Sequence, residues 1–374
     1  MLLFPAVGRA QAQKEPYPNR TSNRTLNRIA NRSGTVDRPP ALSARSAVLM
    51  DAATGRILYE ENAEEKSLIA STTKIMTGLL VCEAGELDAV VAVPTEAVGI
   101  EGSSMYLQAG ETLTRRELLY GLMLRSGNDA AAALALTVAG SLSAFAAQMN
   151  EKAARLGLTQ THFANPHGLD DEENYSTARD LARLTRAALQ DPTFRAVVST
   201  KSVTAAGRTL TNHNKLLWQY PGAIGVKTGY TRTAGRILVS AAERDGRQLI
   251  AVTIHDPNDW ADHAALLDYG FSHFEVRTLV RAGGIVGQVP VIGGVQAFAD
   301  AEAVLPFSYP LAQDEQPAFR LLLPHMAFAP CEGQIGTLEI LLDGTRIGSI
   351  PLRCAAPVPA IEAKKSFFQR IFGE

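Results

Sequence analysis

The sequence has few cysteines, three among 374 residues. Cys82, Cys331 and Cys354 are too widely spaced for a metal-ligand motif or a disulfide framework. Cys82 lies in an apolar segment, where we expect a small buried hydrophobic side chain. Cys331 and Cys354 flank two strand-like segments, so they can pair if the protein is exported, or remain two free thiols.

An excess of one charge and long apolar runs are also absent. The formal net charge of −2 gives no electrostatic basis for binding nucleic acid. No apolar run reaches the roughly 20 residues that a membrane-spanning helix needs. His162, His167 and His213 are scattered, so we predict no metal site and no cofactor. The length is sufficient for two domains with tails.

The N-terminal segment is apolar and ends in small residues. Residues 1–12 finish with Ala10-Gln11-Ala12, which is typical of the cleavage site of a secretory signal. The usual basic region is missing, so we expect a partial signal peptide, with a frayed apolar terminus as the alternative. Residues 13–40 are polar and rich in Asn, Arg, Ser and Pro, which predicts a flexible linker.

The next segment combines strand and helix patterns. Two short strands surround a turn at Gly55, and a later helix has Ser176 as its expected N-cap. The remaining expected elements are helices at 71–84, 115–124, 129–139, 143–156 and 259–270, and strands at 223–231, 235–244 and 247–255. This order predicts an α+β domain over 41–273, an antiparallel sheet with a helical insertion between its strands.

The last hundred residues have a different pattern. Short runs rich in Val and Ile alternate with Gly and Pro, which predicts a small, non-catalytic, all-β domain over 274–355. Residues 356–374 place Phe367, Phe368 and Ile371 on one helical face beside basic residues. We expect a short amphipathic tail in peripheral contact with a membrane, although a helix docked on the protein has the same pattern.

Ser71-Thr72-Thr73-Lys74 joins a hydroxyl and an amine at the start of a helix. Residues three apart on a helix are neighbours, so Ser71 and Lys74 would lie side by side. Serine needs an adjacent base to act as a nucleophile, and a lysine whose pKa is lowered by burial can be that base. A capped helix with a solvated lysine would have the same tetrapeptide.

Two further polar motifs follow. Ser126-Gly127-Asn128 separates two apolar helices, either as a plain turn or as a loop that holds both polar side chains over a cleft. Lys227-Thr228-Gly229 lies on a predicted strand. It is either an ordinary strand segment with a solvated lysine or part of a strand edge that pairs with a substrate backbone.

Taken together and in this order, the three motifs resemble those of the penicillin-binding proteins and class A β-lactamases. The similarity covers residues 45–273 and is greatest to the low-molecular-mass penicillin-binding proteins, which are serine-type D-alanyl-D-alanine carboxypeptidases. Segments such as "LIASTTKIMTGLL", "LLYGLMLRSGNDAA" and "GVKTGYTRTAGRILVSAAERDG" carry the resemblance. It implies an exported enzyme that acts on peptidoglycan stem peptides outside the cytoplasm and is acylated by β-lactam antibiotics.

The resemblance also implies roles for particular residues. Ser71 would attack the carbonyl between the two terminal D-alanines, and Lys74 would take its proton. Ser126 would pass a proton to the leaving D-alanine, while Asn128 would hold Lys74 and the substrate amide.

The substrate-binding roles follow in the same way. Lys227 and Thr228 would bind the terminal carboxylate, and Gly229 would keep the strand edge free of bulk. The backbone N–H groups of Ser71 and Tyr230 would form the oxyanion hole.

One departure concerns the substrate carboxylate. Many members of the family have an arginine downstream of the Lys-Thr-Gly strand, and "HDPNDWADHAALLDYGF" has none there. Arg232 or Arg236 could assist Lys227 and Thr228, or both could be solvated.

Other activities remain open for the same motifs. A D,D-endopeptidase would use the same apparatus on crosslinked peptides, and an inert wall-binding protein would keep only the fold. A β-lactamase would need a deacylating glutamate, but the acidic run 170–173 lacks the usual surroundings of that residue and is expected to be a solvated loop.

Overall fold

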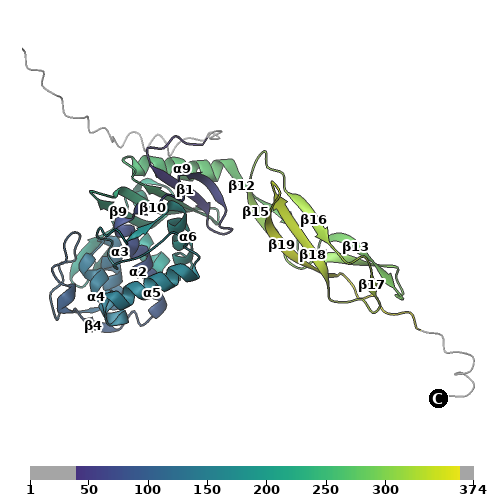
Figure 1. Cartoon of the computed structure of the whole chain (residues 1–374), viewed down its shortest axis with the longest axis horizontal. Helices are drawn as coiled ribbons and strands as arrows, with labels where there is room; N and C mark the ends of the chain where they lie inside the picture. Colours follow the sequence, from purple (N-terminus) through teal and green to yellow (C-terminus); the bar gives the residue numbers. More distant parts are fainter. Residues whose placement is uncertain (1–38, 363–374) are drawn as a thin grey trace, which may run out of the picture.

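A computed structural model describes residues 39–362. Figure 1 shows a broad body of helices and strands at one end and an elongated body of strands at the other. The predicted signal segment 1–12, nearly all of the predicted linker and most of the predicted tail lie outside the described residues.

The first body is built on an antiparallel five-stranded sheet with the order β2-β1-β11-β10-β9. Its strands are β1 (Ser46–Asp51), β2 (Ile57–Glu61), β9 (Ala223–Thr231), β10 (Gly235–Arg244) and β11 (Arg247–Ile254). The turn between β1 and β2 contains Gly55 at φ 75°, and Asp245 and Gly246 join β10 to β11, both at positive φ. Strand β9 is an edge strand, so one side of its backbone has no strand partner in the sheet.

Alternation along the strands separates two apolar layers. Val48 and Met50 pack with the helical insertion, whereas Leu49 packs on the opposite face with α9 (Asp259–His273). The inserted helices are α2 (Lys74–Ala84), α3 (Arg115–Leu124), α4 (Asn128–Ala139), α5 (Leu142–Arg155), α6 (Ala178–Ala188), α7 (Pro192–Ser199) and α8 (Leu216–Gln219). The predicted α+β fold with a helical insertion is confirmed.

Short elements connect these helices. They are the 3-10 turns η1 (Ala70–Thr73) and η2 (Thr95–Ala97), and the strands β3 (Ser67–Leu68), β4 (Val90–Ala92), β5 (Thr112–Thr114), β6 (Tyr175–Ser176), β7 (Ser202–Ala205) and β8 (Arg208–Thr211).

One predicted helix cap was wrong. The N-cap of α6 is Thr177, whose hydroxyl accepts a hydrogen bond from the backbone N–H of Asp180. Ser176 pairs with β3 as part of β6 instead, and its hydroxyl lies 2.7 Å from that of Thr161. Both residue types cap helices well, so the choice depends on the strand pairing one residue earlier.

The second body contains only strands among its described residues. They are β12 (Phe274–Val280), β13 (Ile285–Ile292), β14 (Phe298–Ala303), β15 (Phe307–Ala312), β16 (Ala318–Leu322), β17 (Ala327–Phe328), β18 (Gln334–Leu342) and β19 (Thr345–Cys354). Six of them form a sheet in the order β16-β18-β19-β14-β13-β17, and β12 pairs with β15. The predicted all-β fold of this part of the chain is confirmed.

The two bodies meet at the turn between β1 and β2. Arg56 in this turn donates a hydrogen bond to the Pro310 carbonyl and forms an ion pair with Glu315. Its guanidinium also lies 5.3 Å from the ring centre of Phe274 and 5.2 Å from that of Tyr309. The β body therefore attaches at the β2 edge of the sheet, opposite β9.

No single helix between residues 39 and 362 has the length and apolar character to cross a membrane. By length and composition alone, α4 and α5 would pass this test as a pair, with an 85° bend between them.

Candidate active site

Ser71 and Lys74 lie where the turn η1 runs into helix α2. The Nζ atom of Lys74 is 3.0 Å from the Oγ atom of Ser71, so the predicted neighbouring hydroxyl and amine are in contact. Lys74 is completely buried, which is rare for lysine. The structure thus places a potential base within hydrogen-bond distance of a potential nucleophile.

The surroundings of Lys74 favour its neutral form. Burial and the nearby charge of Lys227 lower the pKa of Lys74 well below its usual value. The Nζ atom donates to Asn128 Oδ1 at 2.7 Å and to the backbone carbonyl of His167. These contacts fix the amine in position, and a neutral amine can accept the proton of Ser71.

Ser126 and Asn128 lie at the break between α3 and α4, as the second motif predicted. Ser126 is buried and has a positive φ of 60°, a strained conformation of the kind often found at functional sites. Asn128 begins α4 and donates through Nδ2 to the Glu101 carbonyl at 2.6 Å. Asn128 therefore connects Lys74 with the loop around Glu101.

The third motif lies on the edge strand β9. Lys227 is buried, and this burial lowers its pKa to about 7. Its Nζ atom donates to the backbone carbonyl of Thr228 at 2.8 Å. A Cβ atom on Gly229 would lie 3.3 Å from the backbone N of Thr72, so the missing side chain allows β9 to approach the turn that carries Ser71.

A cavity of about 290 Å³ joins these motifs. Five predicted residues line it, namely Ser71, Ser126, Thr228, Gly229 and Tyr230. Lys74, Asn128 and Lys227 are buried and do not line it. Hydrogen bonds join Lys74 to Ser71 and Asn128, and Lys227 to Thr228. The structure therefore gathers all eight predicted residues around one cavity.

Five further residues line the same cavity and were not predicted as a set, namely Ser103, His213, Arg236, Asp259 and Trp260. Burial, with the charges of Lys227 and Arg125, lowers the pKa of His213 to about 4, so its imidazole is neutral near pH 7. In the sequence, His213 is one of three histidines that are too scattered for a metal site. Its position beside Lys227 could not be inferred from sequence spacing.

Of the two candidate arginines, Arg236 lines the cavity and Arg232 is not among the lining residues. Arg236 forms a two-atom ion pair with Asp259, with distances of 2.9 Å and 3.1 Å. Its guanidinium is 6.0 Å from the ring centre of Trp260. Asp259 and Trp260 therefore hold the charged Arg236 side chain in place on the cavity wall, near the end of β9.

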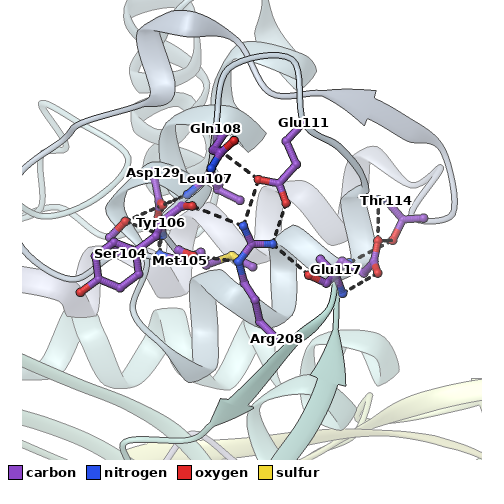
Figure 2. Close-up of polar contacts among 11 residues, drawn as sticks. Ser104, Met105, Tyr106, Leu107, Gln108, Glu111, Thr114, Glu117, Asp129 and Arg208 are labelled. Carbon is purple, nitrogen blue, oxygen red and sulfur yellow. Dashed lines mark hydrogen bonds and ion pairs between the residues drawn. The ribbon is translucent and has the colours of Figure 1, made fainter.

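The loop before Leu107 is held from two sides (Figure 2). The Asp129 carboxylate accepts hydrogen bonds from the backbone N–H of Met105 and Leu107 and from the Ser104 hydroxyl. Arg208 donates to the carbonyls of Met105 and Tyr106 and pairs with Glu111. Asp129 directly follows the Ser-Gly-Asn motif, and this position was the only signal in the sequence for these contacts with the loop.

The acidic run 170–173 is exposed, as expected for a solvated loop. Among residues 39–362, no group of three or more His, Cys, Asp or Glu side chains is arranged to hold a metal ion.

A buried amine beside a serine at a cavity defines a serine acyl-transfer site. The family model for D-alanyl-D-alanine carboxypeptidase matches residues 33–258. The chain is 34% identical to D-alanyl-D-alanine carboxypeptidase DacF of Bacillus subtilis, over 83% of this chain and 85% of the relative. It is also 34% identical to DacC of Escherichia coli, over 84% of each chain.

Solved structures show the same relationship. Penicillin-binding protein 5 of Haemophilus influenzae superposes with a TM-score of 0.74 at 30% identity, over 86% of this chain and 99% of that chain. The D-alanyl-D-alanine carboxypeptidase DacD of Francisella tularensis gives a TM-score of 0.71 at 27% identity, over 93% of this chain and all of the other. The chain belongs to the D-alanyl-D-alanine carboxypeptidase family, as the resemblance of its motifs predicted.

Proposed function

We propose that the protein is a serine D,D-carboxypeptidase that removes the terminal D-alanine from peptidoglycan stem pentapeptides. The observation that carries the proposal is the 3.0 Å contact between Ser71 and a completely buried Lys74. In this proposal Ser71 is the nucleophile and Lys74 is the general base.

Acylation would begin with the attack of Ser71 Oγ on the carbonyl between the two D-alanines, while Lys74 takes the hydroxyl proton. The backbone N–H groups of Ser71 and Tyr230 would stabilise the oxyanion, an interaction that typically contributes about a hundredfold or more to the rate. Ser126 would pass the proton to the nitrogen of the leaving D-alanine, and Asn128 would hold Lys74. Water would then hydrolyse the ester, releasing the shortened peptide and restoring Ser71.

The substrate would lie along β9. Because β9 is an edge strand, the peptide backbone can pair with it as an added strand. The missing side chain of Gly229 keeps this strand close to the turn that carries Ser71. The terminal carboxylate would be bound by Lys227 and Thr228. Arg236 supplies a further cation on the same cavity wall, and we assign it to the carboxylate in place of the downstream arginine that this chain lacks.

The proposed location is outside the cytoplasm, at the cell wall. An exported chain with a signal segment near its N-terminus fits a peptidoglycan substrate. We propose residues 41–273 as the catalytic domain and 274–355 as a non-catalytic domain. The segment 356–374 would then provide peripheral contact with the membrane.

The proposal is tested by intact-protein mass spectrometry after adding excess penicillin, with the free drug followed in the same tube. A lasting adduct of one drug mass on the Ser71 peptide is expected, together with release of D-alanine from a stem pentapeptide. Rapid loss of drug without an adduct would indicate a β-lactamase, and neither adduct nor loss would indicate an inert relative. Cleavage of crosslinked peptides without release of D-alanine from the pentapeptide would indicate an endopeptidase.

Three serines line the cavity, so the nucleophile needs its own control. Ser71→Ala should abolish the adduct while the folded protein retains its circular dichroism spectrum. Ser103→Ala should keep the adduct, because Ser103 lies in the same cavity but has no base in contact with it. A persistent adduct on Ser71→Ala would refute the assignment of the nucleophile.

A further inference from the structure

Two buried cysteines lie in contact in the β body. The Sγ atoms of Cys331 and Cys354 are 3.0 Å apart, although the residues are 23 positions apart in the chain. Both side chains are buried in a small apolar cluster with Val291, Ala299 and Val358. The structure presents both as thiols.

The backbone already holds both residues in place for a crosslink. Cys331 exchanges two hydrogen bonds with Val358, at 3.0 Å and 2.9 Å. The backbone N–H of Cys354 donates to the Gly333 carbonyl at 2.9 Å, and Cys354 stands opposite Ala301 in the pairing of β14 with β19. A disulfide requires its sulfur atoms about 2.05 Å apart, so each sulfur needs to move by only about half an ångström.

We propose that Cys331 and Cys354 form a structural disulfide in the working protein. The oxidant is a disulfide of the surrounding compartment, either glutathione disulfide or an oxidised dithiol protein. The two thiols together lose two protons and two electrons as their sulfur–sulfur bond forms, and the bond of the oxidant is reduced to two thiols. The inference rests on the proposed function only in that the enzyme works in an oxidising compartment outside the cytoplasm.

The position of the pair indicates what the bond would do. Cys331 precedes β18 and Cys354 ends β19, so the crosslink would close the open end of this two-stranded hairpin. Through Val358, it would also tie down the segment that leads towards the C-terminus. The local core has only five buried residues, and small cores of this kind are commonly reinforced by disulfides.

The third cysteine provides an internal control. Cys82 is buried in the core of the other body, on α2, and belongs to a different apolar cluster. It has no cysteine beside it, so it should remain a thiol under conditions that oxidise the proposed pair.

The experiment equilibrates the full chain in an oxidising glutathione buffer, denatures it, alkylates free thiols and measures its intact mass. One alkylated cysteine, at Cys82, is expected, with Cys331 and Cys354 recovered in one crosslinked peptide about 2 Da lighter than the two reduced peptides together. Three alkylated cysteines would overturn the proposal, as would a mixed disulfide with glutathione in place of the internal bond.

Stability measurements on variants complete the test. Reductant should lower the denaturant midpoint of the wild type and of Cys82→Ala, but leave the double variant Cys331→Ala, Cys354→Ala unchanged. An equal response of the double variant would refute a structural role. Penicillin added to the same samples separates the two proposals, because loss of the Ser71 adduct would count against the enzyme and leave the thiol result standing.

Discussion

At the scale of single residues, the site depends on two lysines that are kept close together in a buried region. Lys74 and Lys227 are both almost inaccessible, and the charge of Lys227 adds to burial in lowering the pKa of Lys74. Two like charges at short range disfavour each other, so the site favours one charged and one neutral amine. This division suits a reaction that needs both a base and a cation.

The first prediction concerns the pH dependence of kcat/KM for a peptide ending in D-Ala-D-Ala. In the proposed role, Lys227 would bind the carboxylate only when protonated, so kcat/KM should fall as the pH rises above about 7, the pKa of Lys227. As the proposed general base, Lys74 would act only when neutral, so kcat/KM should also fall on the acid side, below the lowered pKa of Lys74. Steady-state kinetics across this range should give a bell-shaped profile.

Lys227→Arg is the matched variant, because an arginine stays charged throughout this range. Whatever its absolute rate, its profile should lack the decline above pH 7. If the variant shows the same alkaline decline as the wild type, Lys227 is not the group that titrates.

At the scale of elements, a loop from a distant part of the chain packs against the turn that carries Ser71, the proposed nucleophile. The loop 165–168 supplies the Pro166 carbonyl to Thr77 and the His167 carbonyl to Lys74. Gly168 has a φ of 87°, and a Cβ atom there would lie 2.0 Å from the Ala70 carbonyl oxygen. The loop is thus packed directly against the turn that carries Ser71.

The second prediction is that Gly168→Ala displaces the Ser71 turn. Because a misplacement of about 1 Å can lower a rate by about a hundredfold, penicillin acylation should slow by about that factor while the protein stays folded. Stopped-flow acylation kinetics would measure this effect.

Gly157→Ala is the control that separates displacement of the Ser71 turn from the backbone strain of an alanine at positive φ. Gly157 also has a positive φ, 68°, but no atom lies within 4 Å of its added Cβ. This control should lose about 1 kcal/mol of stability and acylate at the wild-type rate. Equal rates for both variants would show that the loop does not position the serine.

The elements also show how far the sequence could predict this molecule. Strands β9 and β10 have the predicted limits, because their apolar pattern and flanking turn residues are local signals. The cap of α6 was misplaced by one residue, since strand pairing rather than residue type decided it. The eight site residues were found through motifs, whereas Ser103, Asp259 and Trp260 were missed because only the fold brings their loops to the cavity.

At the scale of the whole molecule, Arg56 makes several contacts across the junction between the two bodies. Its side chain is mostly shielded from solvent and contacts Glu315, Pro310 and two aromatic rings. Removing one partner of a shielded ion pair leaves the other charge uncompensated, which costs more than losing an exposed pair.

The third prediction is that Arg56→Ala loosens this junction by about 2 kcal/mol, between the values typical of exposed and fully buried pairs. Limited proteolysis near β12 should then become faster. Release of D-alanine from soluble peptide should remain within about twofold of wild type, because the site lies at the opposite edge of the sheet.

Arg45→Ala is the control. It removes an ion pair between Arg45 and Glu65 in which the arginine side chain is 61% exposed, so the rate of limited proteolysis near β12 should not change. If the protease cleaves Arg56→Ala as slowly as Arg45→Ala, the contacts of Arg56 do not hold the two bodies together.

The attachment of the β body at the β2 edge has a further consequence. The cavity stands at the β9 edge, and the described chain ends beside β13 and β17, at the far tip of the β body in Figure 1. The β body therefore lies between residue 362, where the described chain ends, and the cavity that contains Ser71. With the proposed membrane contact of segment 356–374, the length of the β body would set the height of Ser71 above the membrane surface.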